Sequence, residues 1–355
     1  MRIAHLVLHS CIRASKIAWL TMEKGHECYM ITERPLIGGN WKDFGVTALI
    51  HTGQLEWNPD VDVWSIRRTI RALDPIVDVY HIHNEPDWPV EVVRRETSKP
   101  IVWDIHDLRS MREGKVDDIE ALALEKCDGI SVVSGRYKRL LQERTTKPII
   151  EVLSAVPRKL YPTFRRVPSR RGLVYEGGLK GVDKEKSDQF HWRSWGDVFR
   201  EISEMDIEVW AYPSFSPGEN RQNYSTSGAM IMDSLPYDEL LYNLTSHEAG
   251  LVGSPFPSPA FDGAMPNKLF EYIAAGIPVI CMNAPAAEEF LLASGFGVGI
   301  TDLKEIPDVL EQFRKENLRQ YIWEMREHWC MERQIQKVFT LYSKVTGIEV
   351  DYEPM

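Results

Sequence analysis

Short apolar runs that alternate with longer helical patterns constrain the fold of this chain more than any other feature. In its first part, six runs of four to six residues are typical of buried strands, and five stretches with helical spacing lie between them. Such alternation predicts βαβ units and a mostly parallel sheet. The expected strands are Ile3–Leu8, Glu27–Ile31, Val77–Ile82, Pro100–Asp104, Gly129–Val133 and Ile149–Val152, and the expected helices are Ser15–Lys24, Trp64–Leu73, Pro89–Thr97, Val116–Lys126 and Gly135–Thr145.

The segment Ser154–Arg171 interrupts this alternation. It contains three prolines and six arginine or lysine residues, a composition typical of a linker. A second alternating series follows, so the chain contains two similar α/β halves. The expected strands of this series are Gly172–Tyr175, Ile207–Tyr212, Ala229–Met232, Ala249–Val252, Pro278–Cys281 and Val298–Ile300, and its expected helices are Trp195–Glu204, Tyr237–Leu244, Lys268–Ala275, Pro285–Ser294, Leu303–Phe313 and one long amphipathic helix over about Leu318–Thr346.

A length of 355 residues agrees with two domains, because a domain commonly holds about 100–200 residues. We therefore predict an α/β fold with two Rossmann-like, doubly wound domains that face each other across a cleft. Proteins of this kind bind their ligands in clefts between domains, at the carboxyl ends of the parallel strands.

The charge balance excludes one class of function. The chain has 42 lysines and arginines against 52 aspartates and glutamates, and the formal net charge of −10 argues against a generally basic nucleic-acid-binding protein. Residues 1–170 carry 26 basic and 23 acidic side chains, whereas the remainder carries 16 and 29. The basic 134–171 region is either a solvated helix and linker or a surface for an anionic acceptor or an anionic membrane.

Targeting signals are not evident. There is no run of about 18 apolar residues, so no transmembrane helix is expected, and the N-terminus is typical of a first buried strand rather than a signal peptide. Five scattered cysteines without a Cys-x-x-Cys pair indicate reduced thiols and argue against a zinc or disulfide framework. We expect a cytoplasmic protein, with peripheral binding at the inner face of the membrane as one role of the basic region.

The most informative stretch covers residues 264–280, Ala-Met-Pro-Asn-Lys-Leu-Phe-Glu-Tyr-Ile-Ala-Ala-Gly-Ile-Pro-Val-Ile. Pro266 and Asn267 suit a helix start, the proline as first helical residue and the asparagine as cap. A helix N-terminus favours phosphate, and Lys268 adds a positive charge there. Glu271 lies on the same helix face, where its carboxylate can accept hydrogen bonds from two ribose hydroxyls. The alternative is a helix with a solvated lysine and glutamate near its N-terminus.

This stretch resembles the donor-binding signature of GT-B glycosyltransferases, especially the family 4-like group that uses nucleotide sugars. The shared pattern is Pro-x-Lys-x-x-Glu-Tyr, followed by Ala-x-Gly-x-Pro-Val. By this resemblance, Glu271 holds the nucleotide ribose and Lys268 lies near the diphosphate. The resemblance implies no metal and no other cofactor, and a donor site that comprises Gly177, Gly178, Lys180, Lys184, Tyr212, Pro266, Asn267, Lys268, Leu269 and Glu271.

Other segments resemble the same group in the same order along nearly the whole chain. They are 78–85 (Asp-Val-Tyr-His-Ile-His-Asn-Glu), 101–107 (Ile-Val-Trp-Asp-Ile-His-Asp), 123–134, 173–179 (Leu-Val-Tyr-Glu-Gly-Gly-Leu), 235–241 with 248–251, and 328–342. In that fold the last helix crosses back onto the N-terminal domain. The resemblance therefore implies an acceptor domain of residues 1–165 plus about 330–355, and a donor domain of residues 172–329.

Three positions depart from the pattern of the group. Many family 4 enzymes have two glutamates separated by seven residues, and Glu271 fits the second, but Gly263 occupies the first position. Gly178 stands where an arginine is usual, and Lys180 or Lys184 is the candidate replacement. Residues 10–13, Ser-Cys-Ile-Arg, stand in place of the glycine pair that usually follows the first strand. These departures leave the sugar and the stereochemical outcome open.

His106 and Asp107 end a predicted strand at the cleft. A retaining transferase must stabilise the departing diphosphate with fixed cations and helix N–H groups, and it needs a polar group near the transferred sugar. This assigns Lys268, Gly177 and Gly178 to the leaving group and His106 to the sugar or the acceptor. The predicted catalytic residues are His106, Asp107, Lys268 and Glu271. An inverting enzyme needs a carboxylate as general base, and Asp107 or Glu85 suits that role.

Several of these residues also have a structural interpretation. Asp107 can cap the next segment, His83 can be a strand-end histidine with a backbone partner, and Asn84 with Glu85 can form a polar turn. In the functional interpretation, His83, Asn84 and Glu85 lie on the acceptor side of the site. Asp60-Val-Asp62 matches the metal-binding motif of GT-A enzymes, but it follows a proline and precedes a helix, so a cap and a turn explain it.

We predict a glycosyltransferase that moves a sugar, with retention, from a nucleoside-diphosphate sugar to a glycan, lipid-linked or other acceptor. Two alternatives stay open. One is a nucleotide-sugar epimerase on the same fold, a class that needs acids and histidines around the sugar, which His106 and Asp107 can supply. The other is a non-catalytic sugar-nucleotide-binding module, suggested by Gly178 and Gly263.

Overall fold

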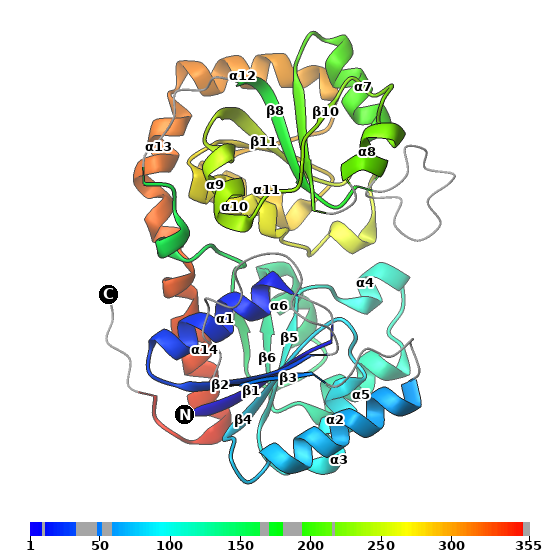
Figure 1. The fold of residues 1–355 in the computed structure, drawn as a ribbon, viewed down its shortest axis with the longest axis vertical. Coiled ribbons are helices and arrows are strands. Elements are labelled where there is room, and N and C mark those ends of the chain that lie inside the picture. Colours follow the sequence, from blue (N-terminus) through cyan, green and yellow to red (C-terminus); the bar gives the residue numbers. More distant parts are fainter. Residues whose placement is uncertain are drawn as a thin grey trace. The chain divides into compact units, whose positions relative to one another are not determined.

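The computed structural model describes residues 1–8, 11–32, 48–51, 59–163, 170–179, 194–214 and 217–350, with the backbone alone at 48–51, 59–62 and 217. The chain divides into two compact units (Figure 1). Unit 1 comprises Met1–Pro157 and Met331–Met355, and unit 2 comprises Arg158–Cys330. The division therefore falls at residues 157 and 158, whereas the sequence analysis placed it between 165 and 172.

Unit 1 contains a seven-stranded parallel sheet with the order β3-β2-β1-β4-β5-β6-β7. The chain builds the sheet outward from β1 in one direction and then from β4 in the other, so the two strands flank a topological switch point. The strands are β1 (Arg2–Val7), β2 (Glu27–Thr32), β3 (Ala48–His51), β4 (Val79–His83), β5 (Ile101–Ile105), β6 (Gly129–Val132) and β7 (Ile149–Glu151). The helices are α1 (Ile12–Glu23), α2 (Pro59–Leu73), α3 (Pro89–Glu96), α4 (Arg109–Glu113), α5 (Asp118–Lys126), α6 (Gly135–Gln142) and α14 (Met331–Thr346).

Helices cover both faces of this sheet, as the central strand β4 shows. Tyr80 points to one face, where its hydroxyl donates to the Ile70 carbonyl of α2 at 3.3 Å. The next residue, His81, points to the other face, where its Nδ1 lies 2.7 Å from the Tyr342 hydroxyl of α14. α1 packs against α14, and α3 packs against both α2 and α5 (Figure 1). Burial on both faces explains why these strands are nearly continuous apolar runs.

Unit 2 repeats the plan with a six-stranded parallel sheet in the order β10-β9-β8-β11-β12-β13. Its switch point lies between β8 and β11. The strands are β8 (Arg170–Gly177), β9 (Val209–Pro213), β10 (Met230–Ile231), β11 (His247–Gly253), β12 (Val279–Met282) and β13 (Gly297–Ile300). The helices are α7 (Gly196–Glu204), α8 (Pro217–Asn223), α9 (Tyr237–Leu244), α10 (Asn267–Ala275), α11 (Pro285–Ser294), α12 (Ile306–Lys315) and α13 (Leu318–Met325), with 3₁₀ turns at Arg158–Leu160, Pro259–Phe261, Leu303–Glu305 and Arg326–Trp329.

The predicted strands are all present, and the alternating α/β pattern is confirmed. The short strand β3 and the helices α4 and α8 were not predicted. Among the described residues, no helix is both long and apolar enough to cross a membrane.

The prediction of one helix over Leu318–Thr346 was wrong, because the chain changes units within it. The buried Arg326 guanidinium donates to the Ala274 carbonyl at 2.6 Å and to the Pro162 carbonyl at 2.9 Å, which fixes the end of α13 within unit 2. Cys330 then has an extended backbone with ψ 160°. The Met331 N–H donates to the Val156 carbonyl of unit 1 at 3.0 Å. Each helix therefore follows the packing of its own unit.

Candidate functional site

Unit 2 places predicted donor residues at the carboxyl end of its switch-point strands. Gly177 ends β8, and α10 follows β11, the neighbouring strand. Gly177 has φ +118°, a conformation that L side chains rarely adopt, and a Cβ added there would lie 3.0 Å from the Lys268 Nζ. The same Nζ lies 3.8 Å from the centroid of the Tyr175 ring, a cation–π contact. The lysine of α10 therefore lies directly over the glycine turn that ends β8.

Glu271 lies one helical turn further along α10 and is almost completely buried. Its Oε1 accepts a hydrogen bond of 3.0 Å from the hydroxyl of Tyr237, the first residue of α9. Burial and the adjacent Glu271 carboxylate raise the pKa of Tyr237 well above its usual range, so the hydroxyl keeps its proton and donates. Tyr237 was not predicted as a site residue, and it fixes the orientation of the carboxylate.

The start of α10 differs from the prediction. Asn267 is the first helical residue and Pro266 occupies the N-cap position, the reverse of the expected order. A proline has no side-chain acceptor, so no side chain of the cap residue bonds to the first N–H groups, although the Pro266 carbonyl accepts from the Leu269 N–H at 3.1 Å. The helix start keeps N–H groups without a side-chain cap, as an anion-binding helix start requires. Leu269 is fully buried and contributes packing.

The remaining predicted donor residues fall into two groups. The Gly178 carbonyl accepts a hydrogen bond of 3.0 Å from the Tyr175 hydroxyl, next to Lys268. The Tyr212 hydroxyl instead contacts Arg170 and lies 3.2 Å from the His247 Nε2. Arg170 and His247 begin β8 and β11, so the Tyr212 hydroxyl points away from the carboxyl end of the sheet, although its backbone pairs in register with Glu176, next to Gly177. Lys180 and Lys184 lie outside the described residues.

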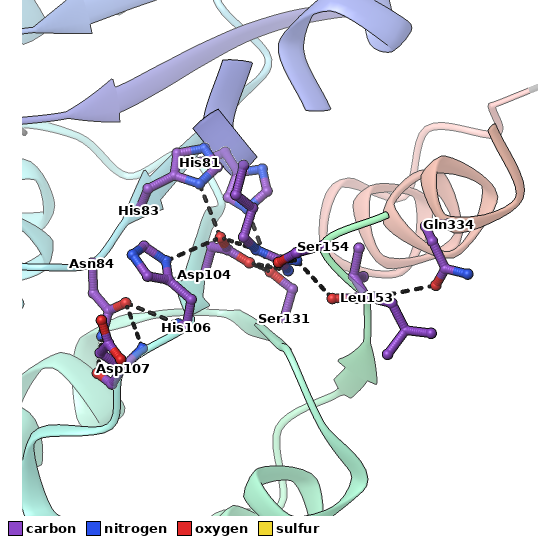
Figure 2. Close-up of polar contacts among 12 residues, drawn as sticks. His81, His83, Asn84, Asp104, His106, Asp107, Ser131, Leu153, Ser154 and Gln334 are labelled. Carbon is purple, nitrogen blue, oxygen red and sulfur yellow. Dashed lines mark hydrogen bonds and ion pairs between the residues drawn. The ribbon is translucent and has the colours of Figure 1, made fainter. Parts of the chain in front are cut away.

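In unit 1, a row of buried polar side chains crosses one face of the sheet (Figure 2). His5 on β1 pairs in register with His81 on β4, His83 pairs with Asp104 on β5, and Asp104 pairs with Ser131 on β6. All five residues are at most 1% exposed. Polar side chains at these positions require internal partners, because burial without a hydrogen bond costs roughly 2–7 kcal/mol each.

Asp104 is the centre of this row and receives hydrogen bonds on both oxygens. Arg13 of α1 donates from Nε to Oδ2 at 2.9 Å and from Nη2 to Oδ1 at 2.8 Å. The Ser131 hydroxyl donates to Oδ1 at 2.6 Å, and His83 Nδ1 donates to Oδ2 at 3.0 Å. Burial alone would raise the pKa of Asp104, but Arg13 and the other donors outweigh it and hold that pKa well below its usual range. Asp104 is therefore a buried, fully paired carboxylate.

The three histidines of the row are neutral. Burial lowers the pKa of His5, His81 and His83, although Asp104 offsets part of the effect at His83. A neutral ring donates from one nitrogen and accepts at the other, so His83 accepts at Nε2 from the His5 Nδ1 at 3.1 Å. His81 accepts at Nδ1 from the Tyr342 hydroxyl. These directions assign the tautomers from the hydrogen-bond pattern.

The ring nitrogens of His5, His81 and His83 lie within 4.8 Å of one another, close enough for a metal ion. The same nitrogens are engaged in hydrogen bonds with protein groups. The Arg13 guanidinium is paired with Asp104 in the same network, and its positive charge opposes a cation there. The network is complete without an ion.

His106 connects this buried network to the open end of β5. Its Nδ1 lies 3.8 Å from Asp104 Oδ2, too far for a hydrogen bond but within ion-pair range, and its side chain is 22% exposed. Burial alone would lower the pKa of His106, but Cys11, Asp104 and Asp107 outweigh it and raise that pKa to about 9. His106 is therefore positively charged at neutral pH.

The acceptor-side residues follow β4 and meet the end of β5 (Figure 2). Asn84 is buried, and its Oδ1 accepts from the His106 N–H at 2.9 Å while its Nδ2 donates to the Asp107 carbonyl at 2.5 Å. Glu85 is paired with Arg112, whose Nη1 lies 2.5 Å from its Oε2. Asn84 therefore holds the segment that carries His106 and Asp107.

Two structural interpretations from the sequence are wrong. Leu108, not Asp107, occupies the N-cap of α4, and the Asp107 side chain is exposed. The His83 ring bonds to the Asp104 carboxylate rather than to the backbone. The structure thus leaves Asp107 as an exposed carboxylate and Glu85 as an ion-paired one.

Several cations of the basic 134–171 region have partners within their own unit. Arg144 pairs with Glu120 at 2.8 Å, and Lys147 donates to the Leu124 and Cys127 carbonyls at 2.7 and 2.6 Å. Arg170 lies over the Trp210 ring. These side chains stabilise the fold, which supports the structural interpretation for this part of the region.

The buried histidines predict an acid-sensitive fold. Their pKa values are lowered in the folded protein, so below about pH 6.5 the unfolded chain binds more protons and the free energy of unfolding falls. His106 has a raised pKa, so its stabilising contribution is complete below about pH 6.5 and is lost as the pH rises through about 9.

Chemical denaturation from pH 5 to pH 9 measures this dependence. The control variant His81→Gln retains a hydrogen-bonding side chain but removes one titrating ring. We expect a smaller loss of stability between pH 7 and pH 5 in this variant. An identical loss in both proteins would show that His81 is not a neutral buried histidine.

The chain resembles known proteins in part of its sequence and in its fold. Residues 203–335 match the family model of the C-terminal domain of glucosyltransferase 3-like proteins, a stretch that includes α10 but begins after Gly177. Sucrose-phosphate synthase from Thermosynechococcus elongatus superimposes with a TM-score of 0.70 and 13% identity, over 98% of this chain and 99% of that one. HepE of Anabaena in complex with UDP-glucose superimposes with a TM-score of 0.69 and 10% identity, over 98% and 100%. The chain has the GT-B fold. No curated protein matches the chain by sequence.

The GT-B fold hosts more than one reaction. A UDP-N-acetylglucosamine 2-epimerase also superimposes, with a TM-score of 0.63, 11% identity, and coverage of 100% of this chain and 99% of that one. The reaction must therefore be argued from the residues of the site and not from GT-B architecture.

Proposed function

We propose that this GT-B chain is a glycosyltransferase that takes its sugar from a nucleoside-diphosphate sugar bound to unit 2. The observation that carries the proposal is the placement of Lys268 over the Gly177 turn, with Glu271 fixed by Tyr237 one helical turn away. A cation and a helix N-terminus suit a diphosphate, and a fixed carboxylate suits the two hydroxyls of a ribose. The match to a glucosyltransferase 3-like domain and the UDP-glucose complex of HepE make UDP-glucose the first donor to test.

The proposed chemistry follows from the position at which negative charge develops during sugar transfer. When the bond between the anomeric carbon and the diphosphate breaks, the leaving group gains negative charge. Lys268 and the N–H groups at the start of α10 stabilise that charge, and they are in place before the reaction begins. Glu271 and Tyr237 orient the nucleoside, so that the sugar is held in one position.

Retention of anomeric configuration is part of the proposal and is supported by the resemblance of α10 to retaining enzymes. Proton NMR of the product gives the anomer directly. Asp107→Asn separates the alternatives, because an inverting enzyme would lose its general base and most of its kcat. Glu85 is the weaker candidate base, because Arg112 already pairs with it.

A panel of nucleotide sugars, followed by ³¹P NMR, tests the function itself. A transferase releases free nucleoside diphosphate, faster when its acceptor is present. An epimerase yields a new sugar nucleotide with the diphosphate still attached, and a binding module shifts resonances without turnover. The last two outcomes would contradict the proposal.

The acceptor is proposed to bind unit 1, near His106, Asn84 and Asp107. A glycan or a lipid-linked acceptor supplies hydroxyl groups of the required kind. A peripheral contact of the 134–171 region with anionic membranes is proposed as well, and sedimentation with phosphatidylglycerol vesicles against phosphatidylcholine vesicles tests it.

A further inference from the structure

The aromatic ring of Tyr175 contacts the ammonium group of Lys268 within unit 2. Tyr175 lies near the end of β8 and is 2% exposed, and Lys268 is half-buried in the first turn of α10. The Lys268 Nζ lies 3.8 Å from the ring centroid, where the negative face of the ring attracts a cation. Within the part of the chain that the structure describes, Lys268 forms no ion pair. The ring therefore holds the positive charge in place without neutralising it.

The hydroxyl of the same tyrosine contacts the glycine turn on which the lysine lies. It donates a hydrogen bond of 3.0 Å to the Gly178 carbonyl. Because a peptide group is planar, this bond fixes the orientation of the whole group that joins Gly178 to Leu179. The preceding Gly177 is the residue whose added Cβ would lie 3.0 Å from the Lys268 Nζ. One side chain thus contacts both the cation and the turn of the proposed diphosphate site.

The ring of Tyr175 is itself held by the aromatic core of unit 2. Its centroid lies 4.9 Å from that of Trp195 and 5.7 Å from that of Phe199, with an edge-to-face arrangement at Phe199. Lysine has a flexible four-carbon stem and loses rotamer freedom when its ammonium group is fixed. A ring fixed by the core therefore restricts a side chain that would otherwise occupy several positions.

We propose that Tyr175 is the positioning residue of the donor site. Its ring places the Lys268 ammonium group over the Gly177 turn before the donor binds, and its hydroxyl fixes the turn. A cation that is already in place stabilises a leaving group without reorganisation during the reaction. A carboxylate in the position of the ring would compete with the diphosphate for this cation. The catalytic consequence rests on the proposed glycosyltransferase function, whereas the position of the lysine does not.

NMR of the lysine side chains tests this position in the full-length protein. The protein is labelled with ¹³C-lysine, and the signal of the Lys268 Cε protons is identified by its absence from Lys268→Arg. Protons that lie over an aromatic face are shifted upfield by the ring current, so we expect this signal upfield of the usual lysine position. The shift is expected to persist in Tyr175→Phe, which keeps the ring, and to disappear in Tyr175→Leu.

Tyr224→Leu is the matched control. Tyr224 is a fully buried tyrosine of the same core, its ring lies beside Phe199, and its hydroxyl accepts from the Trp195 N–H at 3.2 Å. This variant loses a buried tyrosine from the same cluster, so it reproduces the packing defect of Tyr175→Leu. The Lys268 signal and kcat are expected to stay native in the folded control.

Sugar transfer at saturating donor gives the second readout. Tyr175→Leu is expected to reduce kcat by roughly 10–10²-fold, because a displacement of about 1 Å at a catalytic group can have such an effect. Tyr175→Phe is expected to keep most of kcat and to raise the KM for the donor, because only the turn has lost a contact. An unchanged KM in Tyr175→Phe would overturn the role of the hydroxyl.

The two readouts separate the proposed position from the proposed function. If the protein transfers no sugar, the function fails, and the NMR spectrum still decides where the lysine lies. A native Lys268 signal at the usual lysine position would overturn the proposal even if Tyr175→Leu failed to fold. A shift that survives in folded Tyr175→Leu, or that is lost equally in Tyr224→Leu, would also overturn it. Loss of the shift with native kcat would overturn the catalytic consequence.

Discussion

Lys268→Ala is expected to reduce kcat for sugar transfer by about 10²–10³-fold, the range observed when one fixed stabilising donor is removed from a developing anion. The lysine Nζ lies over the Gly177 turn, and the methyl group of an alanine at position 268 cannot reach that position. Transfer rates at saturating donor give the change in kcat. A fall in kcat distinguishes leaving-group stabilisation from simple donor binding, which would appear mainly in KM.

Lys315→Ala is the matched control for this prediction. Lys315 is an exposed lysine of the same unit and pairs with Glu311 one helical turn away. Such surface pairs contribute little, so this variant is expected to retain native kcat. A loss of less than threefold in Lys268→Ala would show that the diphosphate is stabilised elsewhere.

The second large effect concerns the stability of unit 1. Arg13→Met leaves the Asp104 carboxylate buried and uncompensated, and the expected loss is about 3–5 kcal/mol. The double variant Arg13→Met/Asp104→Leu removes both charges and is expected to recover most of that loss. Hydrogen exchange of the β5 amides, read by mass spectrometry, reports opening of unit 1 separately from unit 2.

Arg2→Met provides the comparison, because the Arg2–Asp78 pair is partly exposed and is expected to contribute at most about 1 kcal/mol. A double variant as unstable as Arg13→Met would contradict the account. It would show that the loss came from packing of the arginine and not from an unpaired carboxylate.

The parts of the fold that depend on local patterns could be predicted. Apolar runs such as Ile101–Ile105 mark buried strands, and the lysine and glutamate of α10 are separated by one helical turn, so their shared face follows from spacing alone. Gly177 was predicted only through the family resemblance, because the strand expected from the pattern ended at Tyr175, two residues before the end of β8. β3 was missed although Ala-Leu-Ile at 48–50 is a short apolar run, and strands of the same length or shorter were predicted elsewhere.

The polar network of unit 1 could not be predicted, because it depends on strand register. Arg13 and Asp104 are 91 residues apart, and they meet only when β5 lies beneath α1 in the folded sheet. A charged residue inside an apolar strand was the available signal, since aspartate is almost never fully buried without a partner. That signal indicates a partner but does not identify it. Tyr237, which is 34 residues from Glu271, was missed for the same reason.

The break between α13 and α14 shows a different limit. The amphipathic pattern of residues 318–346 continues through the break, so periodicity alone predicts one helix. The buried Arg326 ends the first helix through carbonyl partners on distant segments of unit 2. Tertiary contacts determine the boundary between α13 and α14, and the amphipathic pattern of the sequence does not reveal these contacts.

Binding of UDP-glucose to the native protein and to Glu271→Ala, measured by isothermal titration calorimetry, tests the central claim most directly. Glu271 is expected to accept hydrogen bonds from the ribose, and each bond to a charged group contributes about 1.5–3 kcal/mol. The predicted result is native binding and at least a tenfold weaker affinity in Glu271→Ala, with folding unchanged by circular dichroism. Equal affinity in the two proteins would contradict the assignment of the donor site to α10.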